Sequence, residues 1–524
     1  MKEEKVIRSA GVVGSFTLLS RGLGMIRDVI IGFYFGTSLI ASAFFVAFTI
    51  PNLFRRLFGE GALSAAFIPI FIETRSKEGE NAAWEMASKV VTMIAALLST
   101  ISIVGMILFS VAAKLPGISE KWAVTLELAL IMFPYVIFIC LAALFMAVLN
   151  SYKHFSTSAF APCLLNLILI IVMLVIFPII GSNELDRAHV LSIAVLVAGV
   201  AQMVIQIPAL KRFGCPFRFS SQWNDPRIRK MLLLMGPAAL GMAVTQFNVL
   251  IDRFLALWIG DWAPAALFYS ERMIYFPLGI IATAMGTVLL PTFSAHAAEG
   301  DHTSMTRTLS HSMRHMIFIM MPAALGLLVL APDIIRTIFE WKGNFNAQST
   351  LLSARALAFY APGLVVFSAA KLLVPAFYAL QDTKTPVRIG VGVVLLNLTL
   401  NIIFILTLPL YWKHAGMALA TVLAEAAGMI VLGILLARRI KGIAWKNTAQ
   451  TAARSFVCAL AMAAAAWSTA QAATPLLSAH LPIKIAQVTS LTAAVGAGAL
   501  AYLLLSILLR APELREIKSA LRRK

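Results

Sequence analysis

The sequence predicts an all-α polytopic membrane protein, and three observations support this fold class. Of the 524 residues, 60% are hydrophobic and 13% are charged, and the mean hydropathy is +0.87. Apolar stretches of about 20 residues, long enough to cross a bilayer as helices, recur from end to end. Lysine and arginine concentrate in alternate connections between these stretches. This composition excludes a soluble globular domain.

The apolar stretches predict fourteen transmembrane helices. The first two are the most highly charged, which lowers their hydropathy. In chain order, the predicted spans cover residues 9–34, 38–62, 86–113, 122–150, 159–181, 188–210, 231–259, 265–297, 314–341, 352–380, 386–409, 413–437, 451–473 and 483–510.

The basic residues orient these spans. Connections such as 211–230 and 438–446 are rich in Lys and Arg, whereas 181–186 and 260–264 carry few. By the positive-inside rule both termini are cytoplasmic, which requires an even number of spans, and fourteen meets that requirement. The basic loops also explain the formal net charge of +19 without a nucleic-acid partner.

Short matches between the two halves indicate an internal duplication. Arg27-Asp28 corresponds to Asp252-Arg253, and Pro51 corresponds to Pro277. Each copy has six spans and starts on the cytoplasmic side, so the copies are parallel, as in alternating-access transporters. The predicted domains are an N-terminal lobe (1–210), an amphipathic cytoplasmic linker (211–230), a C-terminal lobe (231–440), two extra helices (451–510) and a basic cytoplasmic tail (511–524).

Several arginines lie inside predicted spans. A charge at the bilayer centre costs about 2.5–3.5 kcal/mol, so we expect these side chains to line a wet, cationic cavity between the lobes. The planar guanidinium group suits bidentate binding of phosphate oxygens, and a diphosphate fits this chemistry best. The predicted diphosphate ligands are Arg21, Arg27, Arg55, Arg56 and Arg272.

Other charged residues accompany these arginines. We expect gating or ion-pairing roles for Asp28, Glu60, Asp252, Arg253 and Glu271. In the alternative interpretation, Arg21 or Arg27 only locks helices together by pairing with Asp28 or Glu60. Arg56 and Glu60 are four residues apart and can also pair along one helix. Because arginines outnumber the nearby carboxylates, the interpretation as a cationic cavity is preferred.

The remaining polar residues within spans give weaker signals. Lys371 and Asn52 are candidate cavity residues, and Lys371 either faces the cavity or snorkels to the interface. Three asparagines are interpreted as hydrogen-bonding residues in helix packing: Asn166, Asn397 and Asn401. Glu425 is either an ion or proton site or a packed carboxyl group. The four cysteines lack metal-ligand spacing, so no metal site is expected.

Two runs of residues carry a resemblance to a known family. Residues 51–62 are PNLFRRLFGEGA, and residues 20–28 are SRGLGMIRD. Further matching segments are residues 160–162, 271–279, 286–291 and 371–386. In these motifs the chain resembles the MurJ (MviN) family of lipid II flippases, from about residue 8 to the end of the twelfth span and more loosely beyond it.

The resemblance implies a fold of the multidrug/oligosaccharidyl-lipid/polysaccharide exporter superfamily. It implies that lipid II, the undecaprenyl-diphosphate peptidoglycan precursor, moves from the cytoplasmic to the outer leaflet. The positions of Arg21, Arg27, Arg55 and Arg272 would be essential or substrate-facing, and Glu60 important. The last two helices would form a groove for the lipid tail. Ser42 and Tyr275 replace acids found in some members, so gating pairs that use those acids are not expected here.

The same resemblance implies where and with what the protein works. We expect a monomer in the bacterial cytoplasmic (inner) membrane, in contact with membrane lipids and with other cell-wall synthesis proteins. No cofactor is expected, and transport would be coupled to membrane potential or a monovalent ion. A polysaccharide-unit flippase is the nearest rival. A cationic-drug exporter would need excess cavity carboxylates, and an enzyme would need a metal cluster or a nucleophile–base pair, which the sequence lacks.

Overall fold

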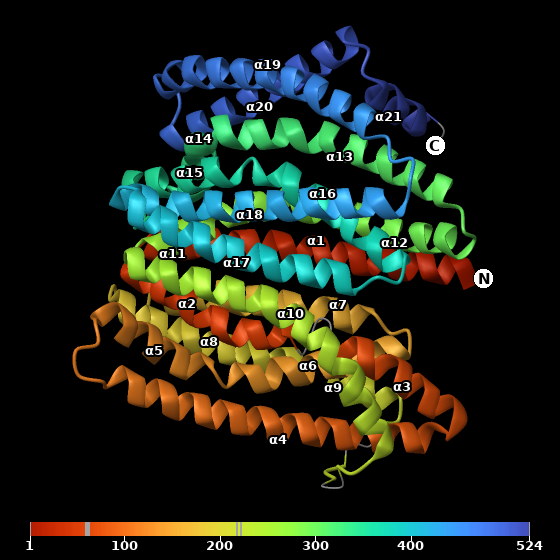
Figure 1. Ribbon diagram of the computed structural model, residues 1–524. Coiled ribbons are helices and arrows are strands. Elements are labelled where there is room, and N and C mark those ends of the chain that lie inside the picture. The colour runs from red at the N-terminus through yellow and green to blue at the C-terminus, as the bar shows by residue number, and fades with distance from the viewer. Residues whose placement is uncertain (1, 58–62, 216–217, 221–222, 523–524) are drawn as a thin grey trace. The chain divides into compact units, whose positions relative to one another are not determined.

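The computed structural model describes residues 2–57, 63–215, 218–220 and 223–522, and every regular element in these ranges is a helix (Figure 1). The predicted all-α class is therefore confirmed. The contacts divide the chain into two compact units, Met1–Ala265 (unit 1) and Ala266–Lys524 (unit 2).

Unit 1 is a bundle of mostly long, apolar helices. Within it, α1 packs against α7, α2 against α5, α6 against α8, and α10 against both α2 and α3. Its elements are α1 (Lys2–Phe35), α2 (Leu39–Phe54), α3 (Leu63–Lys77), α4 (Glu80–Ala113), α5 (Glu120–Met132), α6 (Tyr135–Ser151), α7 (Ser156–Ile171), η2 (Val172–Ile176), α8 (Glu184–Val204), α9 (Ile207–Arg212), α10 (Pro226–Ile259) and the start of α11 (Ala263–Pro277).

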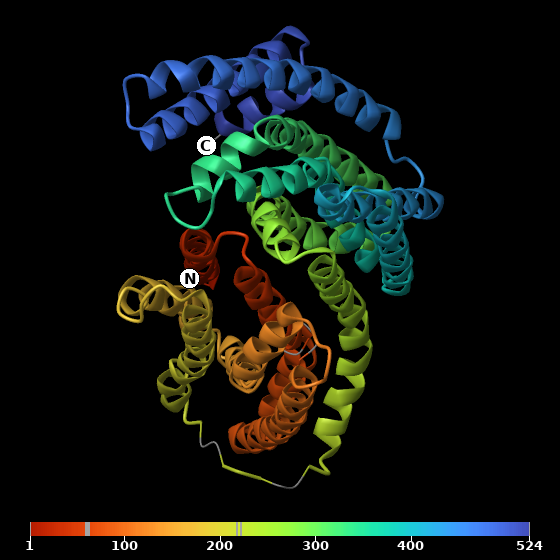
Figure 2. The same cartoon turned by 90° about the vertical axis from the view of Figure 1, so that its left-hand side faces the viewer.

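Unit 2 contains the rest of α11 and the C-terminal helices. Here α13 packs against α16 and α19, α17 against α18, and α19 against α20, and the last pair forms an outer layer of the unit (Figure 2). Its further elements are η3 (Leu278–Ala282), α12 (Thr283–Ala298), α13 (His302–Val329), α14 (Ala331–Phe339), α15 (Ala347–Tyr360), α16 (Gly363–Ala379), α17 (Lys384–Thr407), α18 (Leu410–Arg439), α19 (Trp445–Ser478), α20 (Ile483–Leu508) and α21 (Pro512–Arg522).

Each unit contains one sharply bent helix pair. The bend between α5 and α6 is 43° and contains Pro134, and the bend between α15 and α16 is 45° and contains Pro362. Proline lacks a backbone N–H and clashes with the preceding turn, so it breaks the helical hydrogen-bond ladder. Equivalent bends at equivalent places in the two halves agree with the predicted duplication.

Among the described residues, ten helices are long and apolar enough to cross a membrane, or twelve if each bent pair is one span. These twelve correspond to twelve of the fourteen predicted spans. The two others are α1, which carries Arg21, Arg27 and Asp28, and the stretch α11–η3–α12, which carries Glu271 and Arg272 and is broken by a π-helix. The predicted total of fourteen therefore stays a prediction.

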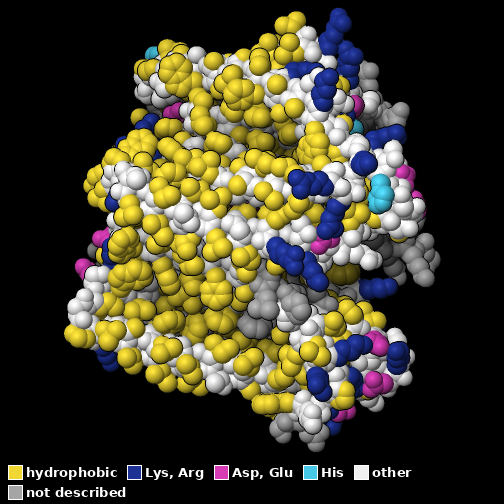
Figure 3. All heavy atoms as spheres, in the orientation of Figure 1, with side chains coloured by type: hydrophobic (Ala, Val, Ile, Leu, Met, Phe, Trp, Pro, Cys, Tyr) yellow, Lys and Arg dark blue, Asp and Glu magenta, His cyan; other side chains and the backbone are white. Residues whose placement is uncertain are grey.

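Apolar side chains cover much of the surface of both units. Figure 3 shows hydrophobic side chains over much of the visible surface of each unit, with Lys and Arg mostly towards the right-hand side of the view, near α21 among other elements. Leu108 on α4 is 61% exposed and Leu508 on α20 is 74% exposed. Exposed apolar surface on this scale is expected where lipid, not water, surrounds the helices. The chain is a multi-pass membrane protein.

The segment before α10 overlaps the predicted linker of residues 211–230. Residues 218–220 and 223–225 are not helical, and α10 begins at Pro226, before the predicted lobe boundary at residue 231. The Asp225 side chain accepts a hydrogen bond from the Arg227 N–H and caps the helix, with proline at the first helical position. Phe219 is 94% exposed, and the interfacial position of the linker stays a prediction.

Candidate functional site

Arg27 lies at the packing contact between α1 and α7. Its Nε and Nη2 donate to Asp28 Oδ1 at 2.9 and 2.6 Å, and its Nη1 donates to Asn166 Oδ1 at 2.9 Å. Asn166 Nδ2 in turn donates to the Ser20 carbonyl at 3.0 Å. A Cβ atom at Gly24 would lie 3.7 Å from Asn166, in ordinary van der Waals contact, so the close approach of the two helices does not depend on this glycine.

This network has the geometry of the helix-locking alternative considered for Arg27. Arg27 is 7% exposed and Asp28 is fully buried. Removing one partner of such a pair leaves an uncompensated buried charge, which costs about 3–5 kcal/mol. A diphosphate can bind Arg27 only by adding to these contacts or replacing them, so substrate binding by Arg27 stays a prediction. Asn166 is confirmed as a helix-packing residue.

Arg21 differs from Arg27 although both lie on α1. Its side chain is partly exposed, and within the described part of the chain no hydrogen bond or ion pair to it is found. Its charge therefore remains available to a ligand.

The end of α2 carries the second arginine pair. Arg55 Nε donates to Asn52 Oδ1 at 2.7 Å, so two predicted site residues meet. The more exposed Arg56 donates from Nη1 to Gln246 Oε1 on α10 at 3.3 Å. The predicted pairing of Arg56 with Glu60 lies outside the described residues.

The residues corresponding to Arg27-Asp28 in the second repeat lie on α10. Arg253 is 7% exposed, and Asn248 Nδ2 donates to Asp252 Oδ2 at 3.5 Å. Both charged residues make further interactions, so neither is an isolated charge in the bilayer. Their predicted roles in gating or ion pairing stay predictions.

In unit 2, Glu271 and Arg272 contact different neighbours. Tyr360 Oη on α15 donates to Glu271 Oε1 at 3.1 Å. The Arg272 guanidinium carbon lies 4.6 Å from the centre of the Phe268 ring, one turn earlier on α11. This agrees with the rule that neighbours at i,i+1 point in different directions on a helix. Glu271 and Arg272 both make further interactions, and their predicted site roles stay predictions.

The other polar residues of unit 2 have mixed surroundings. Asn397 Nδ2 donates to Thr421 on α18 at 3.2 Å, which confirms the predicted packing role of Asn397. Asn401 Nδ2 donates to Asn397 Oδ1 at 3.1 Å within α17, and its packing role stays a prediction. Lys371 on α16 is exposed. An exposed side chain agrees both with a position in the cavity and with snorkelling to the interface. Glu425 is half-buried on α18, and both of its predicted roles stay open.

The two departures from the family pattern have separate surroundings. The Ser42 hydroxyl is buried on α2 and accepts a hydrogen bond from the Ala265 N–H at 3.3 Å. The Ser42 hydroxyl therefore serves a backbone group within unit 1. Tyr275 on α11 is 53% exposed.

An ion-pair network at the start of α10 was not predicted from the sequence. Asp225 Oδ2 lies 3.2 Å from Lys89 Nζ and 2.7 Å from Arg227 Nη2, and Arg227 Nη1 reaches Glu78 at 2.8 Å. Hydrogen bonds from Arg227 hold the pKa of Asp225 well below its usual value. The network fastens the end of the linker to α3 and α4. The sequence indicates the helix start through Asp225 followed by Pro226, because aspartate favours the N-cap and proline the first helical position.

Nearby, Glu73 on α3 lies 2.9 Å from both Lys77 and Lys230. These hydrogen bonds, first of all the one from Lys230, lower the pKa of Glu73 to about 2. A second set of ion pairs therefore joins α10 to α3.

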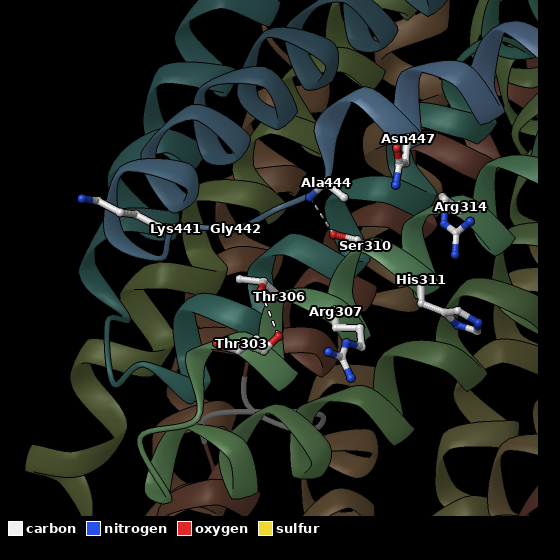
Figure 4. A pocket seen from close by; sticks show the side chains of 10 residues that line it. All are labelled: Thr303, Thr306, Arg307, Ser310, His311, Arg314, Lys441, Gly442, Ala444 and Asn447. Carbon is white, nitrogen blue, oxygen red and sulfur yellow. Dashed lines mark hydrogen bonds between the residues drawn. The ribbon is translucent and has the colours of Figure 1, made fainter.

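A pocket of about 320 Å³ lies between α13 and the start of α19 (Figure 4). The Ser310 hydroxyl accepts a hydrogen bond from the Ala444 N–H at 3.1 Å and so joins the two walls. The pocket is lined by Thr303, Thr306, Arg307, Ser310, His311, Arg314, Lys441, Gly442, Ala444 and Asn447. From the sequence, the basic residues of such loops predict only the orientation of the spans in the membrane.

Comparison with protein families gives one clear match. A family described as "Lipid II flippase MurJ" matches residues 31–486. A curated lipid II flippase MurJ from Burkholderia cenocepacia is 35% identical over 446 residues, covering 83% of this chain and 84% of the relative. A relative from Vibrio cholerae in the same family is 32% identical over 531 residues, covering 99% of this chain and 98% of the relative.

Solved structures show the same fold. A lipid II flippase MurJ structure, titled as an inward closed conformation, has a TM-score of 0.76 at 24% identity, covering 95% of this chain and 98% of that one. An inward-facing multidrug resistance transporter of the MATE family has a TM-score of 0.66 at 14% identity, covering 81% of this chain and 95% of that one.

Proposed function

The chain belongs to the MurJ family of lipid II flippases, and from that premise we propose that it moves lipid II from the cytoplasmic to the outer leaflet of the bacterial inner membrane. The observation that carries this proposal is the family match across residues 31–486, together with relatives that align over most of their own length. Proteins of this family are transporters and not enzymes, which agrees with the prediction from the sequence.

The proposed substrate contact is between arginines and the diphosphate of lipid II. Arg21 is partly exposed, and the Arg272 guanidinium is stacked on Phe268. Guanidinium groups in a site of low dielectric bind phosphate oxygens through short, charge-assisted hydrogen bonds. Arg55 and Arg56 would add to this set from the end of α2, with Asn52 positioning Arg55. Arg27 would join only after exchanging its contact with Asn166 for a phosphate oxygen.

The proposed cycle is alternating access. Six-span repeats that run in parallel support rocking of one lobe against the other around a fixed site. The sugar-peptide head would pass through the wet cavity, while the polyprenyl tail stays in lipid beside α19 and α20. Basic loops on one side support cytoplasmic termini. Gating would use Glu60, Asp252, Arg253 and Glu271, because Ser42 and Tyr275 cannot form carboxylate pairs.

Membrane potential is the proposed driving force. Moving one charge through 100 mV is worth about 2.3 kcal/mol, and an outside-positive potential favours outward movement of an anionic head. A transport rate that is unchanged when the potential is collapsed at constant ion gradients would contradict this part of the proposal and favour a monovalent ion.

The proposed function is tested by replacing a cell's own lipid II flippase. Depleted cells should survive when they express this chain and lyse when they express well-inserted Arg27→Ala or Arg272→Ala variants. Survival with the variants would mean that these arginines only hold helices together. Lysis with the wild-type chain, despite normal membrane levels, would favour a flippase for a polyprenyl-linked polysaccharide unit.

A further inference from the structure

The C-terminal helix α21 meets α13 at a cluster of two histidines and one glutamate. His311 and His315 lie one turn apart on α13, with ring centroids 4.2 Å apart. Glu516 reaches them from α21, and its Oε2 lies 2.7 Å from His311 Nε2 and 3.3 Å from His315 Nε2. The three ligand atoms all lie within 4.8 Å of one another.

The hydrogen bonding of His315 indicates which of its nitrogens can bind a cation. His315 Nδ1 lies 2.9 Å from the His311 carbonyl oxygen, which can only accept. Nδ1 therefore carries a proton, which leaves Nε2, the nitrogen that faces Glu516 Oε2, as the one that can bind a metal ion. That oxygen is buried and also lies 2.7 Å from His311 Nε2. One cation placed between the three atoms would contact both ring nitrogens and the carboxylate oxygen.

A metal ion fits this arrangement of ligand atoms. Each ring can instead carry its own proton and donate it to the carboxylate, whereas a metal ion takes both nitrogens and the carboxylate oxygen at once. Two histidines and a glutamate are a known ligand set for zinc, with bonds of about 2.0–2.2 Å. A ligand histidine usually donates its other N–H to a carbonyl, as His315 does. We propose that His311, His315 and Glu516 bind a divalent ion of the zinc type, with water completing the coordination.

The neighbouring residues support the site. Arg314 Nη2 lies 3.8 Å from Glu516 Oε1, so the carboxylate is held with its other oxygen towards the histidines. Arg314 is itself compensated by Glu513, at 3.5 Å. His311 is half-exposed at the side chain and lines the pocket shown in Figure 4, which gives an ion a path from solvent.

Metal binding would fasten α21 to the helices that precede it. Glu513 on α21 accepts a hydrogen bond from Thr451 on α19 at 2.7 Å, and Tyr502 on α20 donates to the Phe318 carbonyl on α13 at 2.8 Å. The ion would therefore complete a connection among α13, α19, α20 and α21. The site is independent of the proposed transport function, because it uses none of the arginines assigned to substrate.

The direct test is zinc binding to the full chain in detergent, purified without a histidine tag. Calorimetric titration with Zn²⁺ should give one site per chain in the wild type. Substitution of a residue that only hydrogen-bonds to a metal ligand lowers metal affinity about 10–100-fold. His315→Ala and Glu516→Gln each remove a proposed ligand, so each should lower the zinc affinity about 100-fold or more. His302→Ala, at the exposed start of α13, is the matched control and should bind zinc like the wild type.

A second measurement separates metal coordination from a general loss of folding. Zn²⁺ should raise the unfolding temperature of the wild type by mass action but leave that of Glu516→Gln unchanged, while both unfold alike in a chelator. Co²⁺ should give the visible absorption of a four-coordinate site only when Glu516 is present. Equal zinc affinity in the wild type and Glu516→Gln would overturn the proposal and leave a histidine–carboxylate ion pair.

Discussion

Replacing Asp28 by alanine tests the interpretation of the buried network on α1. Arg27 donates two hydrogen bonds to one Asp28 oxygen and one to Asn166, and is 7% exposed. Without Asp28 the guanidinium keeps one neutral partner and stays buried. Removing one partner of a buried ion pair costs about 3–5 kcal/mol. We therefore expect Asp28→Ala to lower the free energy of unfolding by about 3–5 kcal/mol.

The assay is equilibrium unfolding of the purified full chain in mixed micelles. The double variant Arg27→Met/Asp28→Ala removes both charges and should recover most of the loss, because replacing a whole buried pair by apolar groups is often neutral. Asp261→Ala, which breaks an exposed pair with Lys121 at 3.6 Å, should change stability by less than about 1 kcal/mol. Equal losses in Asp28→Ala and the double variant would refute the reasoning.

Two further predictions concern the linker anchor and the helix packing. The pKa of Asp225 is depressed in the folded state, so Asp225→Asn should destabilise the protein at neutral pH. That deficit should shrink as pH falls from the ordinary value of 3.8 towards the lower pKa of the folded state, because the unfolded wild type then binds a proton that folded Asp225 does not, and a deficit independent of pH would contradict this. A Cβ at Gly199 would lie 2.5 Å from the buried Tyr135 ring, so Gly199→Ala should cost about 1–3 kcal/mol in the same unfolding assay. Gly390→Ala, with nothing within 4 Å, should be neutral or stabilising, and equal losses in both would refute the packing argument.

Much of the architecture could be predicted because apolar length is a strong local signal. Spans such as 188–210 and 386–409 correspond closely to α8 and α17. The bends at Pro134 and Pro362 were not predicted, because a proline can interrupt, begin or kink a helix depending on its tertiary neighbours.

The contacts of the site were harder to predict. Spacing on a helix cannot tell whether a flexible arginine turns back to its sequence neighbour, as Arg27 does to Asp28. Partners that are distant in sequence were also missed. The His311–His315 spacing is visible in the sequence, but only the docking of α21 brings Glu516 to it. The expectation of no metal site was based on cysteine spacing alone.

The central claim is that arginines inside the membrane carry the lipid-linked diphosphate across it. The most direct measurement is the amount of lipid II exposed on the outer leaflet of flippase-depleted cells that express this chain, Arg272→Ala or Arg438→Ala. We predict normal exposure for the wild type and for Arg438→Ala, whose charge lies at the end of α18, and loss of exposure for Arg272→Ala at equal membrane levels. Normal exposure of lipid II with Arg272→Ala would contradict the assignment of the substrate site.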